Sequence, residues 1–261
     1  MSEQLLVQRE DPVCTVVLNR PEKRNALTPE MMFELAELLQ GLKDDDRVRV
    51  VVIRGAGTEA FSAGFDIGRI GQRQTYINDS FLSPVAYACE VIEQYPYPVI
   101  AMVYGFCVGG ALELATACDF RIAADTARLG ITPSKLGIVY LPEPVRRFVE
   151  LVGAAHTKEL FITGRLVTAE RALQMGLVNE VVPATQLEEY TYTLAVEIAH
   201  NAPLSVKAAK ETVNRLIGFP RLTPQDVEHF RELRRLAMES EDLKEGRRAF
   251  AEKRRPVFRG R

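Results

Sequence analysis

The sequence predicts an α/β protein of 261 residues, and three observations support that prediction. Short runs rich in β-branched residues alternate with helical patterns through about the first 180 residues. After Asn201, only helical signals remain. With 47% hydrophobic residues, a chain of this length buries roughly three quarters of its unfolded surface, which is enough for one large domain or a domain with an appendage.

The first half of the chain supplies three strands and two helices. Strands are predicted at Val13–Leu18, Val48–Ile53 and Val99–Val103. Thr28 followed by Pro29 is an N-cap with proline at the first helical position. The apolar residues behind it recur at helical spacing, at Met31, Leu35, Leu38 and Leu42. A second helix is predicted over Leu82–Gln94.

The second half changes character near Asn201. Strands are predicted at Asp119–Ala124 and Val178–Val182, the latter preceded by a short helix between Thr168 as N-cap and Gly176 as C-cap. Beyond the strands, helices are predicted to start at Pro203, Thr223-Pro224 and Ser240-Glu241. We therefore expect an α/β core over residues 1–202 and a helical region over residues 203–261.

Composition and charge exclude several classes of function. A formal net charge of -2 gives no global attraction to nucleic acid or to an anionic membrane, so we expect neither as a partner. The four cysteines show no CxxC spacing, and we expect buried thiols in a reducing compartment and no metal site. Met1–Gln4 lacks the basic and apolar regions of a signal peptide, so we expect a cytoplasmic protein.

The most informative motif joins the end of an apolar strand to a helix through paired glycines. It runs from Tyr104 to Ala115, with Gly109-Gly110 at the junction and Glu113 in the first helical turn. Glycines allow a sharp turn and a close ligand approach, and a helix start offers N–H groups without internal partners. The motif indicates an anion-stabilising site, although a tight turn with Glu113 favoured near a helix N-terminus explains the residues equally simply.

Two further motifs strengthen the functional interpretation. Phe61–Ile67 is a second glycine turn after a strand, and Leu18–Leu27 precedes it with the letters LNRPEKRNAL. In order and approximate spacing, the three motifs resemble those of the crotonase (enoyl-CoA hydratase/isomerase) superfamily. The resemblance covers nearly the whole chain. It implies a crotonase-like ββα superhelix with a C-terminal helical trimerisation region, and a homotrimer or dimer of trimers.

The resemblance also implies a site for acyl-CoA. The backbone N–H groups of Phe65 and Gly110 would hold the thioester oxygen, and each such donor contributes roughly 3 to 4 kcal/mol to an enolate-like transition state. Glu113 matches the first catalytic glutamate of enoyl-CoA hydratases. Coenzyme A, present only as part of the substrate, would contact Lys23, Arg24, Ala26, Ala63, Asp66, Ile67, Lys253 and Phe258. No other cofactor is implied.

Two of these assignments have a simpler alternative. Asp66 follows the residue that carries the first oxyanion amide, and this position favours a role in capping or bracing the turn over a role in catalysis. Residues 244–261 carry eight Lys or Arg, which indicates either a solvated basic tail or a segment that brings Lys253 and Phe258 to the CoA of a neighbouring subunit.

One departure from the hydratases decides which reaction the sequence predicts. The position of their second catalytic glutamate is Pro133, which cannot transfer a proton. The run Ile131–Tyr140 and the C-terminal Phe250–Pro256 resemble the methylmalonyl-CoA decarboxylase branch, in which a tyrosine matching Tyr140 lies over the acyl group. That branch has a histidine where this chain has Phe65. Loss of CO2 from a malonyl-type thioester needs the oxyanion donors but no general base.

We therefore expect an acyl-CoA lyase that decarboxylates a short malonyl-type thioester. Two alternatives remain open. One is an enoyl-CoA hydratase or isomerase that acts through Glu113 alone, with a carboxylate such as Glu143 or a bound water in place of the missing glutamate. The other is a non-catalytic CoA-binding protein on the same fold.

Overall fold

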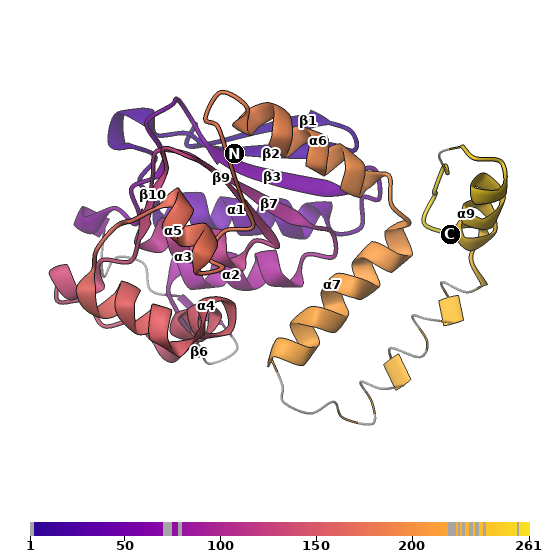
Figure 1. The fold of residues 1–261 in the computed structure, drawn as a ribbon. Helices are drawn as coiled ribbons and strands as arrows, with labels where there is room; N and C mark the ends of the chain where they lie inside the picture. The colour runs from indigo at the N-terminus through magenta and orange to yellow at the C-terminus, as the bar shows by residue number, and fades with distance from the viewer. Residues whose placement is uncertain are drawn as a thin grey trace.

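The computed structural model of the protein describes residues 3–69, 75–77, 80–218, 223, 225, 228–229, 232, 235–236, 239–254 and 256–261 (Figure 1). Its largest sheet has six strands, in the order β1 (Leu5–Glu10), β2 (Val13–Leu18), β3 (Val50–Gly55), β7 (Val99–Val103), β9 (Phe120–Ala124) and β12 (Glu180–Val182). β1 runs antiparallel to β2, and the other neighbours are parallel. Parallel neighbours need crossover connections, which the helices supply.

A second sheet has four strands, and its strands follow those of the large sheet along the chain. It contains β11 (Val167–Thr168), β10 (Arg128–Gly130), β8 (Phe106–Val108) and β4 (Ala60–Ser62), and a separate hairpin is formed by β5 (Thr75–Ile77) and β6 (Ser80–Leu82). In the pairs β3/β4, β7/β8 and β9/β10, the first strand joins the six-stranded sheet and the second joins the four-stranded sheet. A helix follows each pair, so the predicted ββα superhelix is confirmed.

Eight α-helices are defined within the described residues. They are α1 (Pro29–Leu42), α2 (Pro84–Gln94), α3 (Gly110–Ala117), α4 (Pro142–Thr163), α5 (Ala169–Gln174), α6 (Leu187–Ala199), α7 (Pro203–Gly218) and α9 (Glu241–Ala251). In Figure 1, α6 covers one face of the large sheet, α1, α2 and α3 lie on the other, and α7 leads away toward α9 and the C-terminus. No helix among the described residues has the length and apolar character required to cross a bilayer.

Alternation along the strands divides the core between the two faces of the large sheet. Val51 and Ile53 of β3 pack into the cluster formed with α1, α2 and α3, whereas Val50 and Val52 pack on the α6 side. Successive strand side chains point to opposite faces, so a strand covered on both faces is apolar at nearly every position. Burial of the central strands leaves the strand ends and the turns beyond them to carry the polar groups.

Most predicted elements have the expected bounds. β2 and β7 begin and end as predicted, while β3 begins at Val50 instead of Val48 and α2 at Pro84 instead of Leu82. α7 and α9 begin at the predicted Pro203 and Glu241. The predicted start at Thr223-Pro224 lies outside the described residues, apart from Thr223. The division into residues 1–202 and 203–261 stays a prediction.

Candidate active site

The three sequence motifs come together at the carboxyl ends of β4 and β8. Leu27 of the first motif forms an isolated parallel bridge with Phe65 of the second. The Leu27 amide donates to Gly64 O at 2.8 Å, and the Asp66 amide donates to Leu27 O at 2.9 Å. In a parallel bridge of this kind, the N–H of the central residue points away from the partner strand, so the Phe65 N–H is directed to the other side of the turn.

On that other side lies the start of α3. A methyl group placed on Gly110 would lie 3.5 Å from the Phe65 amide nitrogen, and one placed on Gly64 would lie 3.6 Å from the Gly110 amide nitrogen. Neither amide donates a hydrogen bond within the described part of the chain. Two amides without partners, a few ångströms apart at the start of a helix, make the arrangement that a single oxyanion requires.

Two glycines make this approach possible. Gly64 has φ +102 and a side chain there would meet Val108 O at 2.6 Å, so only glycine fits between the second motif and β8. Gly109 has φ 58 and ψ -127 at the N-cap of α3, and its carbonyl accepts the amides of Leu112 and Glu113 at 3.0 and 3.1 Å. The turn therefore starts the helix while leaving the Gly110 N–H for a ligand.

Glu113 is buried on α3, one helical turn beyond Gly110, with 4% of its surface exposed. Within the described residues its Oε1 has no hydrogen-bond partner. Burial raises the pKa of Glu113 to about 7, and the positive charge of Arg147 on α4 opposes that rise. A carboxyl group with a pKa near neutral exchanges protons readily in both directions, which is the property of a general acid and base.

Tyr140 and the neighbouring helices complete the surroundings of Glu113. Tyr140 lies just before α4 with its ring edge-on to Phe161, the centroids 5.4 Å apart. Burial raises the pKa of the Tyr140 hydroxyl, and the charge of Glu113 raises it further. On α2, the Cys89 thiol donates to Glu113 O at 3.6 Å. α2 and the segment that leads into α4 therefore both lie close to Glu113 of α3.

Pro133 occupies the position predicted for a second carboxylate, in the buried first residue of the 3-10 helix Pro133–Lys135. Glu143, considered as a replacement, is exposed on the first turn of α4, and its charge acts on Glu90 of α2. Within the described residues no interaction joins Glu143 to Glu113, and the pKa of Glu113 is affected by Arg147 of α4 instead.

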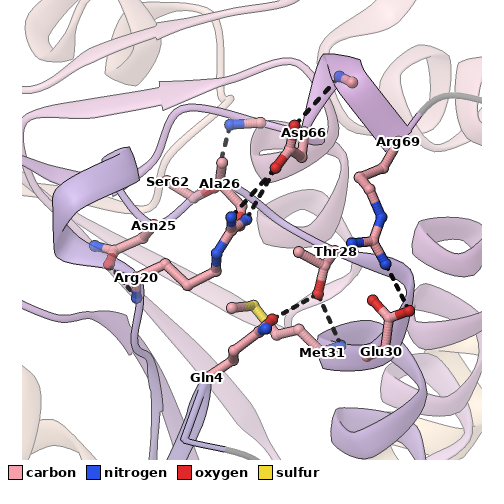
Figure 2. A network of polar contacts seen from close by, with 12 residues as sticks. Gln4, Arg20, Asn25, Ala26, Thr28, Glu30, Met31, Ser62, Asp66 and Arg69 are labelled. Carbon is pink, nitrogen blue, oxygen red and sulfur yellow. Dashed lines mark hydrogen bonds and ion pairs between the residues drawn. The ribbon is translucent and has the colours of Figure 1, made fainter.

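A polar network braces the turn that carries Phe65 (Figure 2). Arg20 donates to Ala26 O at 2.8 Å and to Asp66 Oδ2 at 3.2 and 3.3 Å. The second carboxylate oxygen of Asp66 accepts the Gly68 amide at 3.2 Å. Asp66 thus braces the first and second motifs, as the simpler interpretation predicted, and its contact with CoA stays a prediction.

The other predicted CoA contacts fall into two groups. In the first group, the carbonyl oxygen of the exposed Arg24 accepts a hydrogen bond from the Ala63 amide at 2.9 Å, and Lys23 is the residue before Arg24. Ala26 and Ile67 flank the bridge between the first two motifs, Ile67 at the start of the 3-10 helix Ile67–Arg69. These residues therefore lie along one edge of the site.

Lys253 and Phe258 form the second group and lie elsewhere in this chain. Phe258 packs near Gly246 of α9, and its carbonyl accepts from Arg49 at 3.0 Å. Figure 1 shows this C-terminal segment well separated from α2 and α3. A single chain does not bring Lys253 and Phe258 to Gly110, so their proposed role requires a neighbouring subunit and stays a prediction.

The sequence interpretation missed Arg147. Its side chain is 7% exposed and pairs through Nε and Nη2 with Glu93 of α2, while Nη1 has no partner within the described residues. A signal was present, because Arg147 lies on the same helical face as the buried Pro144 and Phe148. A charged residue on the apolar face of a helix is a buried charge that needs a partner.

Comparison with known proteins assigns nearly the whole chain to one family. The sequence profile described as enoyl-CoA hydratase/isomerase matches residues 8–261. Carnitinyl-CoA dehydratase of Citrobacter koseri is 37% identical over 269 residues, covering 100% of both chains. The crystal structure of an enoyl-CoA hydratase/carnithine racemase from Magnetospirillum magneticum superposes with a TM-score of 0.89 at 31% identity, over 100% of this chain and 97% of that one.

An enoyl-CoA hydratase from Bacillus anthracis gives a TM-score of 0.85 at 35% identity, over 99% of this chain and 100% of that one. These matches confirm the fold and the superfamily expected from the three motifs. The names of these relatives refer to hydratases, a dehydratase and a racemase. The likeness to the methylmalonyl-CoA decarboxylase branch therefore stays a prediction.

Proposed function

Because this chain belongs to the enoyl-CoA hydratase/isomerase family, we propose that it is a lyase that adds water to an enoyl-CoA or removes water from a 3-hydroxyacyl-CoA. In this proposal the amides of Phe65 and Gly110 donate to the thioester oxygen, and Glu113 is the acid–base group. The names of relatives such as the carnitinyl-CoA dehydratase of Citrobacter koseri agree with this reaction class.

The observation that carries the proposal is the buried carboxyl group of Glu113, whose Oε1 is unpartnered and whose pKa is about 7. With one carboxylate, hydration proceeds in two proton transfers. Glu113 takes a proton from water as the water oxygen bonds to C3, and the C2–C3 π electrons move toward the thioester to form an enolate. The protonated Glu113 then returns that proton to C2, so the net change is the addition of one water.

A second candidate is the decarboxylation of a malonyl-type thioester, and a specific observation favours it. Pro133 stands where a second carboxylate would be, and Tyr140 interacts with Glu113 across the site. Breaking the bond between C2 and the carboxylate releases CO2 and leaves the electron pair as the same enolate, which the two amides would stabilise before a proton reaches C2.

A turnover screen distinguishes the two candidates. Crotonyl-CoA and longer enoyl-CoAs are assayed for loss of the conjugated double bond, and malonyl-, methylmalonyl- and ethylmalonyl-CoA for release of CO2. We expect kcat/KM for an enoyl-CoA to exceed that for every malonyl-type substrate. CO2 release without hydration of any enoyl-CoA would reject the first candidate and support the second.

A further inference from the structure

Among the residues that the structure describes, Arg147 and Glu113 each have one buried polar atom without a hydrogen-bond partner, and the two atoms are chemically complementary. Arg147 Nη1 is a donor, Glu113 Oε1 is an acceptor, and both are inaccessible to solvent. Buried polar groups are nearly always hydrogen-bonded, because leaving one unsatisfied costs about 1 to 3 kcal/mol. A ligand group that both accepts and donates a hydrogen bond would satisfy the two atoms together.

The geometry of Arg147 is fixed by its other two nitrogens. Nε and Nη2 both donate to the Glu93 carboxylate on α2, which holds the planar guanidinium in one orientation. No ion pair joins Arg147 to Glu113 within the described part of the chain, yet the charge of each acts on the other. The two side chains are thus close enough for their charges to interact, although no hydrogen bond joins them within the described residues.

The chemistry of the two atoms selects the ligand. A carboxylate could accept from Arg147 but would be repelled by an ionised Glu113, and an ammonium could bind Glu113 but not Arg147. A water molecule, or a substrate hydroxyl group, accepts from Nη1 and donates to Oε1 at the same time. An oxygen of this kind needs no second carboxylate at the position of Pro133.

Resting on the proposed hydration, we propose that Arg147 Nη1 and Glu113 Oε1 together hold the water that is added at C3, or the hydroxyl that leaves it. Arg147 orients a water lone pair toward C3 while Glu113 accepts the water proton. In the reverse direction, Arg147 donates to the departing hydroxyl as Glu113 protonates it. Neither role needs Arg147 to gain or lose a proton.

The test uses two reactions that share Glu113 but differ in the added water. Hydration of crotonyl-CoA needs the water at C3. Exchange of the C2 hydrogen of butyryl-CoA with solvent deuterium needs the oxyanion amides and Glu113 as base, but no oxygen at C3. For Arg147→Met, each rate is measured at its own pH optimum, and we expect hydration to fall about 10- to 100-fold while exchange stays within about threefold of wild type.

A matched control separates this role from the ion pair on α2. Glu93→Gln removes the carboxylate partner but keeps the charge of Arg147, so hydration is expected to fall less than in Arg147→Met. The double variant Arg147→Met with Glu93→Gln leaves neither charge of this ion pair unpaired. It replaces Arg147→Met in the two rate measurements if the single variant fails to fold. Arg147→Lys is expected to restore part of the hydration rate.

The pH profile supplies a further readout. The groups that act on or contact Glu113 are Arg147, Tyr140 and Cys89, while Glu93 neutralises part of the charge of Arg147. Loss of Arg147 removes the positive charge that, among the described residues, lowers the Glu113 pKa, so the acidic limb of kcat/KM is expected to move to higher pH.

Each outcome has a distinct meaning. An equal fall in hydration and exchange, or no fall in hydration, would overturn the role of Arg147 while leaving the proposed function intact. Failure of the wild-type protein to hydrate any enoyl-CoA would overturn the proposed function and this inference with it. A selective loss of hydration supports both.

Discussion

Replacement of Glu113 by glutamine is expected to abolish turnover and to stabilise the fold at alkaline pH. Burial, which leaves 4% of its surface exposed, raises the pKa of this carboxyl group from 4.5 to about 7, and its Oε1 has no hydrogen-bond partner in the described part of the chain. One pKa unit corresponds to about 1.4 kcal/mol, so ionisation of Glu113 lowers the free energy of unfolding by about 3 kcal/mol. Glutamine does not ionise and avoids this cost.

The sign of the effect follows from proton linkage. A carboxyl group whose pKa is raised on folding binds its proton more tightly in the folded state, so its ionisation destabilises the protein as pH rises from about 4.5, and the effect is complete above about pH 7. The difference in unfolding free energy between Glu113→Gln and wild type should therefore grow by about 2 to 3 kcal/mol between pH 5 and pH 8.

Urea denaturation at the two pH values measures this difference, and kcat/KM on the best substrate is expected to fall about 10²- to 10⁴-fold. The exposed Glu143→Gln is the control and is expected to change stability by less than about 0.5 kcal/mol at either pH. Equal differences for Glu113→Gln at pH 5 and pH 8 would refute the buried, high-pKa carboxyl group. Full activity of that variant would refute its role as the acid–base group.

Three further predictions test the arrangement around this residue. Gly110→Ala places a methyl group 3.5 Å from the Phe65 amide nitrogen, where the thioester oxygen should bind. We expect kcat/KM to fall at least about 100-fold with little change in the melting temperature. Unchanged activity would exclude the proposed oxyanion position. Arg20→Leu removes the ion pair between Arg20 and Asp66 that ties the Phe65 turn to the first motif. It should lower kcat about 10-fold in a turnover assay, whereas an effect on KM alone would contradict a bracing role. α7 exposes Val213, Leu216 and Ile217, so we predict a trimer or dimer of trimers by light scattering, and a wild-type monomer at micromolar concentration would contradict it.

The parts of the fold that the sequence predicted are those with local signals. The two predicted N-caps are in place, with Thr28 and Thr168 each accepting the backbone amide of the residue three positions later. Ser83 caps α2 in the same way, although the sequence interpretation did not name it. β1 escaped prediction because its sequence, LLVQRE, has neither a continuous apolar run nor an alternation of apolar and polar residues, and the strand lies at the exposed edge of the sheet. α4 escaped because prolines at both sides of Glu143 resemble a loop, although proline at the first helical positions starts a helix.

The site was predictable as far as backbone turns specify it. Glycine turns after β4 and β8 marked the two segments, and the resemblance to the crotonase superfamily assigned the amides of Phe65 and Gly110 and the role of Glu113. The contact between Arg147 and Glu93 joins residues 54 positions apart, and no short motif encodes a pairing between α2 and α4. The same limit applies to Asn25, whose buried side chain ties the first motif to Ala56 O and Ala60 O at 2.9 and 2.8 Å.

The parallel pairing of β4 with β8 sets the distance between the two donors. Ser62 is paired with Cys107, and the chain reaches Phe65 and Gly110 three residues beyond each of these. Neighbouring strands lie about 4.8 Å apart in any sheet, so this spacing depends on the main-chain hydrogen bonds and not on the identity of any side chain. Side chains around the thioester can therefore be exchanged, in evolution or by design, to change the substrate and the reaction, while the separation of the two amides stays constant.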